Sequence, residues 1–174
     1  SMPSKKRHKI KLVYGHGAFK MFGVIHPESI RATVFREPVD RIISHYYYVK
    51  RSENHYLHKK IEENNIKLSE YCSHNLSGEL ENYYVTRFSG LSIAEVEQNP
   101  KDSVELALKN ITEKYDVIGF QDDIPLFIKK LKKAAKIKTK FKNEILNVTK
   151  NRVGVSELDQ NTFGNISQKN SLDI

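Results

Sequence analysis

The sequence has no tryptophan and only one cysteine, Cys72. One cysteine cannot form an internal disulfide, so the fold does not depend on an oxidised framework. No apolar run approaches the roughly 20 residues that a membrane-crossing helix needs, and the start of the chain does not have the pattern of a signal peptide. The sequence therefore predicts neither a disulfide scaffold nor a membrane segment.

The composition is that of a globular protein with an excess of positive charge. Hydrophobic residues make up 39% of the 174 residues and charged residues 29%, a balance that supports a buried core. We expect one domain, residues 1–174. Lys and Arg number 29 against 21 Asp and Glu, a net charge of +8. This excess suits a polyanionic ligand, such as a nucleotide, a nucleic acid or a sulfated glycan, or is simply a solvated basic surface.

The clearest local pattern begins with residues 31–36, a β-branched and aromatic run that predicts a buried strand. Pro38 follows it and suits the first turn of a helix, because its missing N–H would have no partner there. Apolar residues then recur at helical spacing. They are Val39, Ile42, Ile43 and Tyr46. The strand is therefore expected to lead directly into the positive end of a helix.

Later segments continue the alternation of helices and strands. The predicted elements are two or three helices over 55–89 with breaks near 64–65 and 77–78, a helix over 104–111 capped near Asp102 or Ser103, a strand over 115–120 and a helix over 124–131. Gly90 is expected to end the last of the early helices, and the polar chain beyond Lys136 predicts loops over a core. This order predicts an α/β fold with a parallel sheet flanked by helices.

The junction between the first strand and its helix is the strongest candidate for a ligand site. Backbone N–H groups and the helix dipole favour an anion there. Arg36, at the end of the strand, can bind a phosphate through two hydrogen bonds. Ser44, on the second helical turn, can add a hydroxyl, although helical geometry alone also allows it to face solvent.

Residues 36–46 read Arg-Glu-Pro-Val-Asp-Arg-Ile-Ile-Ser-His-Tyr. This string resembles the 3′-phosphate-binding segment of sulfotransferases that use 3′-phosphoadenosine-5′-phosphosulfate, whose pattern is Arg-x-Pro-x-x-Arg-x-x-Ser-x-Tyr. The resemblance implies a P-loop-NTPase-like sulfotransferase fold. It also implies that Arg36 and Ser44 bind the 3′-phosphate and that Arg41 orients the segment.

Two further segments resemble the heparan and dermatan 2-O-sulfotransferases and their bacterial relatives. Residues 14–19 resemble a Gly-His element that holds the catalytic base, which implies this role for His16. An imidazole titrates near neutral pH and can take the proton of an attacking sugar hydroxyl. Tyr14 stands where some heparan-type members have a second histidine. Residues 81–90 resemble a helix end near the acceptor, where Arg87 either lines the cleft or only packs.

The basic segment at 147–152 resembles the loop that closes over the nucleotide in this family. The resemblance implies phosphate or adenine contacts for Lys150 and Arg152, and a solvated charge pair is the alternative.

The phosphosulfate-binding loop of the family, of the form Pro-Lys-x-Gly/Ala-Gly/Ser-Thr-Ser/Thr, has no counterpart in the sequence. We expect the chain to be incomplete at its N-terminus and cut short near 170–174. A degenerate relative is the alternative.

The resemblance implies an enzyme that transfers a sulfuryl group from 3′-phosphoadenosine-5′-phosphosulfate to a carbohydrate hydroxyl, with adenosine 3′,5′-bisphosphate as product and no metal. One alternative is an inactive nucleotide- or glycan-binding module. Another is a basic nucleic-acid-binding domain, which the sequence disfavours because its aromatic residues form no recognised stacking motif. Bacterial relatives are cytoplasmic and animal relatives work in the Golgi lumen. The single cysteine favours the cytoplasm, and the Golgi applies if a membrane anchor was removed.

Overall fold

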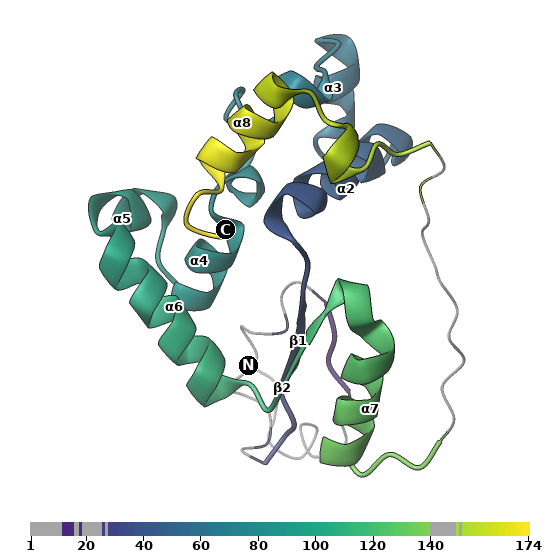
Figure 1. Ribbon diagram of the computed structural model, residues 1–174, viewed down its shortest axis with the longest axis vertical. Coiled ribbons are helices and arrows are strands. Elements are labelled where there is room, and N and C mark those ends of the chain that lie inside the picture. The colour runs from purple at the N-terminus through teal and green to yellow at the C-terminus, as the bar shows by residue number, and fades with distance from the viewer. Residues whose placement is uncertain (1–11, 16–17, 19–25, 27, 140–148, 150) are drawn as a thin grey trace.

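The computed structural model describes residues 12–15, 18, 26, 28–139, 149 and 151–174. Within this part of the chain two strands, β1 (Ala32–Phe35) and β2 (Val117–Phe120), form a parallel pair. Figure 1 shows α6 (Pro100–Lys114) and α7 (Ile124–Ala134) on opposite sides of this pair. The expected α/β class and the parallel pairing are confirmed, and so is the helix at 124–131.

The remaining elements are helical. They are α2 (Pro38–Arg51), α3 (His58–Glu63), α4 (Tyr83–Ser89), α5 (Ile93–Gln98), α8 (Gln160–Lys169) and the short 3-10 turns η2 (Leu68–Glu70), η3 (Gly78–Leu80), η4 (Gln121–Asp123) and η5 (Val155–Glu157). Gly90 ends α4 with a φ of 80°, as its sequence position predicted. Among the described residues, no helix has both the length and the apolar character to cross a bilayer.

The main core lies between α2, α3 and α8, which lie together at one end of the molecule in Figure 1. The apolar positions predicted along α2 are all buried there. They are Val39, Ile42, Ile43 and Tyr46, and Val49 extends the same face. Ile61 of α3 and Ile166 of α8 pack into the same cluster. The helical spacing of the sequence therefore identified the buried face of α2 correctly.

The first strand differs from its prediction. Residues 31–36 were expected to form a buried strand, but Ala32 is exposed and Val34 is 37% exposed. Side chains alternate between the two faces of a strand. The face that carries Phe35 packs against Tyr84 and other aromatic residues of α4. Within the described residues α7 contacts mainly β2, so the opposite face of β1 is left open.

The start of α6 also corrects the sequence prediction. The cap was expected near Asp102 or Ser103, but the helix begins at Pro100 with Asn99 as its N-cap. Pro100 fits the first turn because its missing N–H needs no partner. Ser103 lies one turn inside, where its hydroxyl donates to the Asn99 carbonyl at 2.7 Å and is completely buried. The short helix α5 just before it was not predicted.

Helix α8 lies in the segment where only loops were predicted, so that prediction is wrong. Asp159 caps the helix, because its Oδ1 accepts the Thr162 N–H at 2.9 Å and its Oδ2 accepts the Thr162 hydroxyl at 2.6 Å. Only two of the ten residues of the helix, Phe163 and Ile166, are strongly apolar. Burial of Thr162 and Ile166 against the rest of the molecule supports α8 instead.

Acid is expected to weaken the cap of α8. The hydrogen bonds from the Thr162 hydroxyl and N–H hold the pKa of Asp159 below its ordinary value of about 3.9. Because the folded-state pKa is depressed, this stabilisation is present above the unfolded pKa and is lost as pH falls through the folded one. The melting temperature of wild type should therefore exceed that of Asp159→Ala at pH 7, and the gap should narrow as pH falls below the ordinary aspartate pKa of about 3.9. A gap that is independent of pH would contradict this account.

The end of the chain ties α2, α4 and α8 together. The Asn170 side chain is fully buried and its amide donates to the carbonyls of Leu80 and Ile166 at 3.1 and 3.0 Å. Asp173 accepts the N–H groups of Tyr84 and Val85, both at 2.9 Å, and so caps the first turn of α4. Burial raises the pKa of the Asp173 carboxyl above its ordinary value. These contacts place α4 against the end of β1.

Candidate functional site

The β1–α2 junction is held in place by Tyr84 of α4. Its hydroxyl accepts the backbone N–H of Arg36 at 2.9 Å and donates to the carbonyl of the same residue at 3.0 Å. The ring of Tyr84 packs edge-on against Phe35, with centroids 5.1 Å apart. One side chain therefore satisfies both backbone groups of Arg36 where β1 has ended and α2 has not begun.

Two arginines from distant parts of the sequence meet on one carboxylate at this junction. Nε of Arg36 pairs with Oδ2 of Asp40, and Nη2 of Arg152 pairs with Oδ1 of Asp40. Nη1 of Arg152 also lies 3.5 Å from the Asp40 carbonyl. The three side chains are 19–22% exposed, so the cluster remains open to solvent. Two positive charges and one negative charge leave this arginine cluster, Arg36, Asp40 and Arg152, with a net positive charge.

The backbone N–H groups at the N-terminus of α2 have a different partner from the one that the sequence predicted. They were expected to be available to an anion, but the carboxylate of Glu37 accepts the N–H groups of Val39 and Asp40 at 2.9 and 2.6 Å. Glu37 is the residue just before the helix, where an acidic side chain can fold back onto the first turn. Any anion at this junction must therefore be bound chiefly by guanidinium groups.

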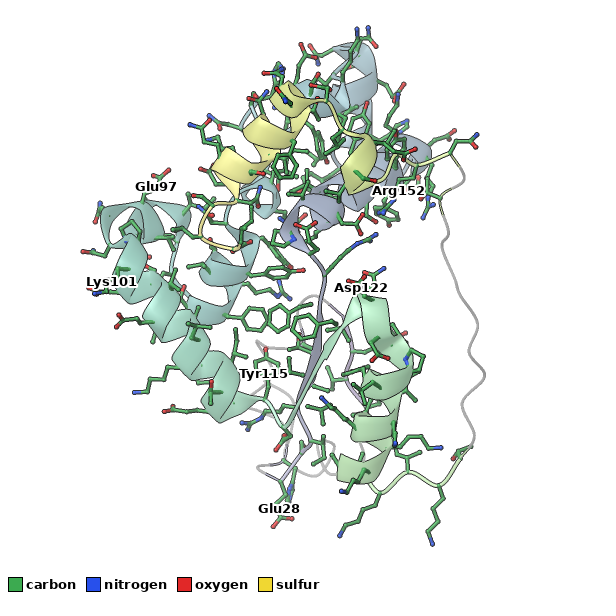
Figure 2. All side chains as sticks on the ribbon, in the orientation of Figure 1. Glu28, Glu97, Lys101, Tyr115, Asp122 and Arg152 are labelled. Atoms are coloured by element: carbon green, nitrogen blue, oxygen red, sulfur yellow. The ribbon has the colours of Figure 1, made fainter. Side chains whose placement is uncertain are left out.

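Ser44 lies one helical turn beyond Asp40 on the same face of α2. Its hydroxyl has no hydrogen-bond partner among the described residues. Arg51, near the end of α2, donates to the Thr149 hydroxyl, while Arg152 reaches Asp40 near the start. Thr149 and Arg152 thus both contact the face of α2 that carries Ser44, and Figure 2 shows Arg152 beside this helix.

Arg41 has internal contacts. Its Nη1 donates to the Glu79 carbonyl at 2.8 Å and its Nη2 to Oδ1 of Asn170 at 3.2 Å. Its guanidinium also lies 4.7 Å from the ring centroid of Tyr83. Burial lowers the pKa of Arg41 below its ordinary value. These contacts of the Arg41 side chain connect α2 to the C-terminal residues and to α4.

The other predicted site residues are not part of this cluster. Arg87 of α4 lies with its guanidinium 5.3 Å from the Tyr83 ring centroid, and no contact between it and the arginine cluster is found in the described chain. His16 and Lys150 lie outside the described residues. The structure therefore brings Arg36, Ser44 and Arg152 to one face of α2 and leaves Arg87 elsewhere.

The arrangement can bind a compact anion. Arg36 uses Nε for Asp40, while its two terminal nitrogens have no partner among the described residues. A guanidinium fork of this kind matches the geometry of a phosphate or sulfate group, and the Ser44 hydroxyl can add a further donor. No cluster of three or more metal-ligating side chains is found in the part of the chain that the structure describes.

The sequence analysis missed Asp40 and Tyr84. Asp40 lies four residues after Arg36 and carries the opposite charge, a spacing that favours a pair wherever the intervening chain is helical. Tyr84 carries no such local signal, because its partner Arg36 lies in a different part of the sequence.

Comparison of the chain with models of protein families, with curated proteins and with solved structures found no match. The resemblance of residues 36–46 to sulfotransferases therefore rests on the string itself. The functional argument below starts from the geometry of the arginine cluster.

Proposed function

We propose that this chain is a sulfotransferase of P-loop-like fold that binds 3′-phosphoadenosine-5′-phosphosulfate and sulfates a hydroxyl group, with a carbohydrate as the expected acceptor. The observation that carries the proposal is the meeting of Arg36 and Arg152 on Asp40. These two arginines were assigned to the nucleotide from separate strings, one at the end of the first strand and one late in the chain. Their proximity is what a shared phosphate site requires.

The residues fit a nucleotide 3′-phosphate by their donor chemistry. The terminal nitrogens of Arg36 would hold two phosphate oxygens, and the Ser44 hydroxyl would donate to the phosphate from the next turn of α2. Arg152 would close over the ligand from the opposite side, exchanging part of its contact with Asp40 for the phosphate. Tyr84 keeps the backbone of Arg36 in place during this exchange.

The chemistry is an in-line transfer of the sulfuryl group. The acceptor oxygen forms a bond to sulfur as the bond from sulfur to the bridging phosphate oxygen breaks, and the hydroxyl proton goes to a base. His16 is the base that the sequence resemblance implies. Adenosine 3′,5′-bisphosphate leaves as the second product, and it is the natural probe of the 3′-phosphate site.

Adenosine 3′,5′-bisphosphate is expected to bind more tightly than AMP, which lacks the 3′-phosphate. Arg36→Ala should weaken its binding about 100-fold, because two charge-assisted hydrogen bonds to one phosphate are lost. Arg152→Ala should weaken it by about tenfold. Calorimetric titration of both nucleotides against each folded variant measures these differences.

The matched control is Lys59→Ala on α3, which removes the same charge from a side chain that is 81% exposed. It should bind like wild type, since exposed charges far from a ligand are largely screened. Equal affinity of wild type and Arg36→Ala for adenosine 3′,5′-bisphosphate would refute the phosphate assignment. A similar loss in Lys59→Ala would point to net charge in place of a specific site.

Turnover is tested separately from binding, because no string of the phosphosulfate-loop form occurs in the sequence. The assay follows release of adenosine 3′,5′-bisphosphate in the presence of an oligosaccharide acceptor. If His16 is the base, His16→Ala keeps nucleotide affinity and loses release. Nucleotide binding without any release in wild type would favour the alternative of an inactive nucleotide-binding module.

A further inference from the structure

A cavity lies beside Tyr84, between the β1–β2 pair and the helices α4 and α6. Its volume is about 300 Å³. Apart from one carboxyl group and the Tyr84 hydroxyl, its walls are apolar. They include Phe35 and Phe120 from the two strands, Tyr84 from α4, and Ala107 and Leu108 from α6. Phe120 and Leu108 are 62% and 58% exposed, so the cavity opens to solvent between them.

Three features distinguish this cavity from loose packing. Protein interiors contain few voids larger than a water molecule, whereas ligand pockets begin at about 300 Å³. The cavity also touches Phe35 and Phe120, the last residues of two paired parallel strands, and ligands of open α/β folds bind beyond these strand ends. Finally, the rings of Phe35, Tyr84 and Phe120 come from three different elements and lie around one space, with Phe35 5.1 Å from Tyr84 and 6.2 Å from Phe120.

Asp173 determines which polar group a ligand can carry. Each of its carboxylate oxygens already accepts one backbone N–H of α4. A carboxylate has about four acceptor positions, so further donors can be accommodated. The Tyr84 hydroxyl is engaged with the backbone of Arg36 and does not offer a second polar contact. A ligand that donates one hydrogen bond is therefore matched, and an anionic ligand is opposed by the carboxylate.

We propose that this cavity, the strand-end pocket, is a binding site for a small neutral aromatic molecule that carries one hydroxyl group. The aromatic walls take the ring of the ligand by edge-to-face and offset contacts. The hydroxyl donates to Asp173. This proposal is independent of the nucleotide proposal, since the strand-end pocket contains none of the residues of the arginine cluster.

The probe is 2-naphthol, whose fluorescence can be followed cleanly because the protein has no tryptophan. Binding should raise its anisotropy in a saturable way. Naphthalene, which lacks the donor, and 2-naphthoate, which is an anion, should each compete about tenfold less well. Adenosine 3′,5′-bisphosphate should not displace the probe, because it occupies a different site.

Two variants test the location of binding. Phe120→Ala removes an exposed wall and should weaken 2-naphthol about tenfold without unfolding the protein. Ala107→Leu places a larger side chain into the cavity. This side chain fills the space that the ligand would occupy, so the substitution should abolish binding. The matched controls are Phe163→Ala, on an α8 residue that is 44% exposed, and Ala94→Leu, at an exposed position of α5. Both should bind 2-naphthol like wild type.

Each outcome of these binding measurements either supports or overturns the strand-end pocket as the binding site. Loss of binding in Phe120→Ala and Ala107→Leu, with both controls unchanged and all variants folded by circular dichroism, supports the strand-end pocket. Saturable binding that survives Ala107→Leu would place the probe elsewhere and overturn the proposal. No binding up to the solubility of 2-naphthol, or a preference for 2-naphthoate, would overturn it as well. None of these results changes the nucleotide titration.

Discussion

Asn170→Ala is expected to lower the free energy of unfolding by about 3 kcal/mol. The side chain of Asn170 is fully buried and makes three hydrogen bonds. Alanine would leave the Leu80 carbonyl without this donor and would remove an acceptor from Arg41, whereas the Ile166 carbonyl would keep the backbone N–H of residue 170. A buried polar group that loses its partner keeps its full desolvation cost, and Arg41 is a charged group.

Urea unfolding followed by circular dichroism measures this loss. The matched control is Asn161→Ala, at an exposed position of α8, which should change the unfolding free energy by no more than about 0.5 kcal/mol. A loss of less than about 1 kcal/mol in Asn170→Ala would contradict the proposed role of the C-terminal residues as the connection between α2, α4 and α8.

Gly119→Val should cost a similar amount, about 3 kcal/mol, for a steric reason. A Cβ at Gly119 would lie 2.5 Å from Cδ2 and 2.6 Å from Cβ of Phe127 on α7. Cβ belongs to the fixed part of Phe127, so rotation of the ring cannot relieve the contact. Helix α7 would have to move away from β2, with loss of the packing between them.

The control for this prediction is another glycine. A Cβ at Gly164 would meet no atom within 4 Å, and Gly164 lies inside α8. Gly164→Ala should therefore raise the unfolding free energy by about 0.5–1 kcal/mol, the usual gain from replacing glycine in a helix. Equal stability of wild type and Gly119→Val in the same urea titration would show that the β2–α7 contact is looser than the distances indicate.

Local patterns in the sequence were sufficient to identify several elements. The apolar spacing of α2 and α7 and the end of α4 at Gly90 follow from interactions between residues that are close in the chain. For the same reason Arg36 and Ser44 could be placed at one strand-to-helix junction. The parallel pairing of the two strands was inferred from the order of helices and strands, since the paired residues are distant in sequence. Helix α8 was not predicted, because few of its residues are apolar and burial of Thr162 and Ile166 supports it; the Asp159 cap was its local signal.

The composition of the candidate site depended on contacts that no local pattern contains. Sequence analysis named Arg36 and Arg152 separately, but their meeting on Asp40 requires Arg152 to lie against α2, as Thr149 also does. The strand-end pocket likewise joins residues from both strands, two helices and the C-terminus. Helical and strand periodicities act over one or two turns, so they specify which face of an element is apolar. The partner of that face, and the space left between the two, are set by packing across the whole chain.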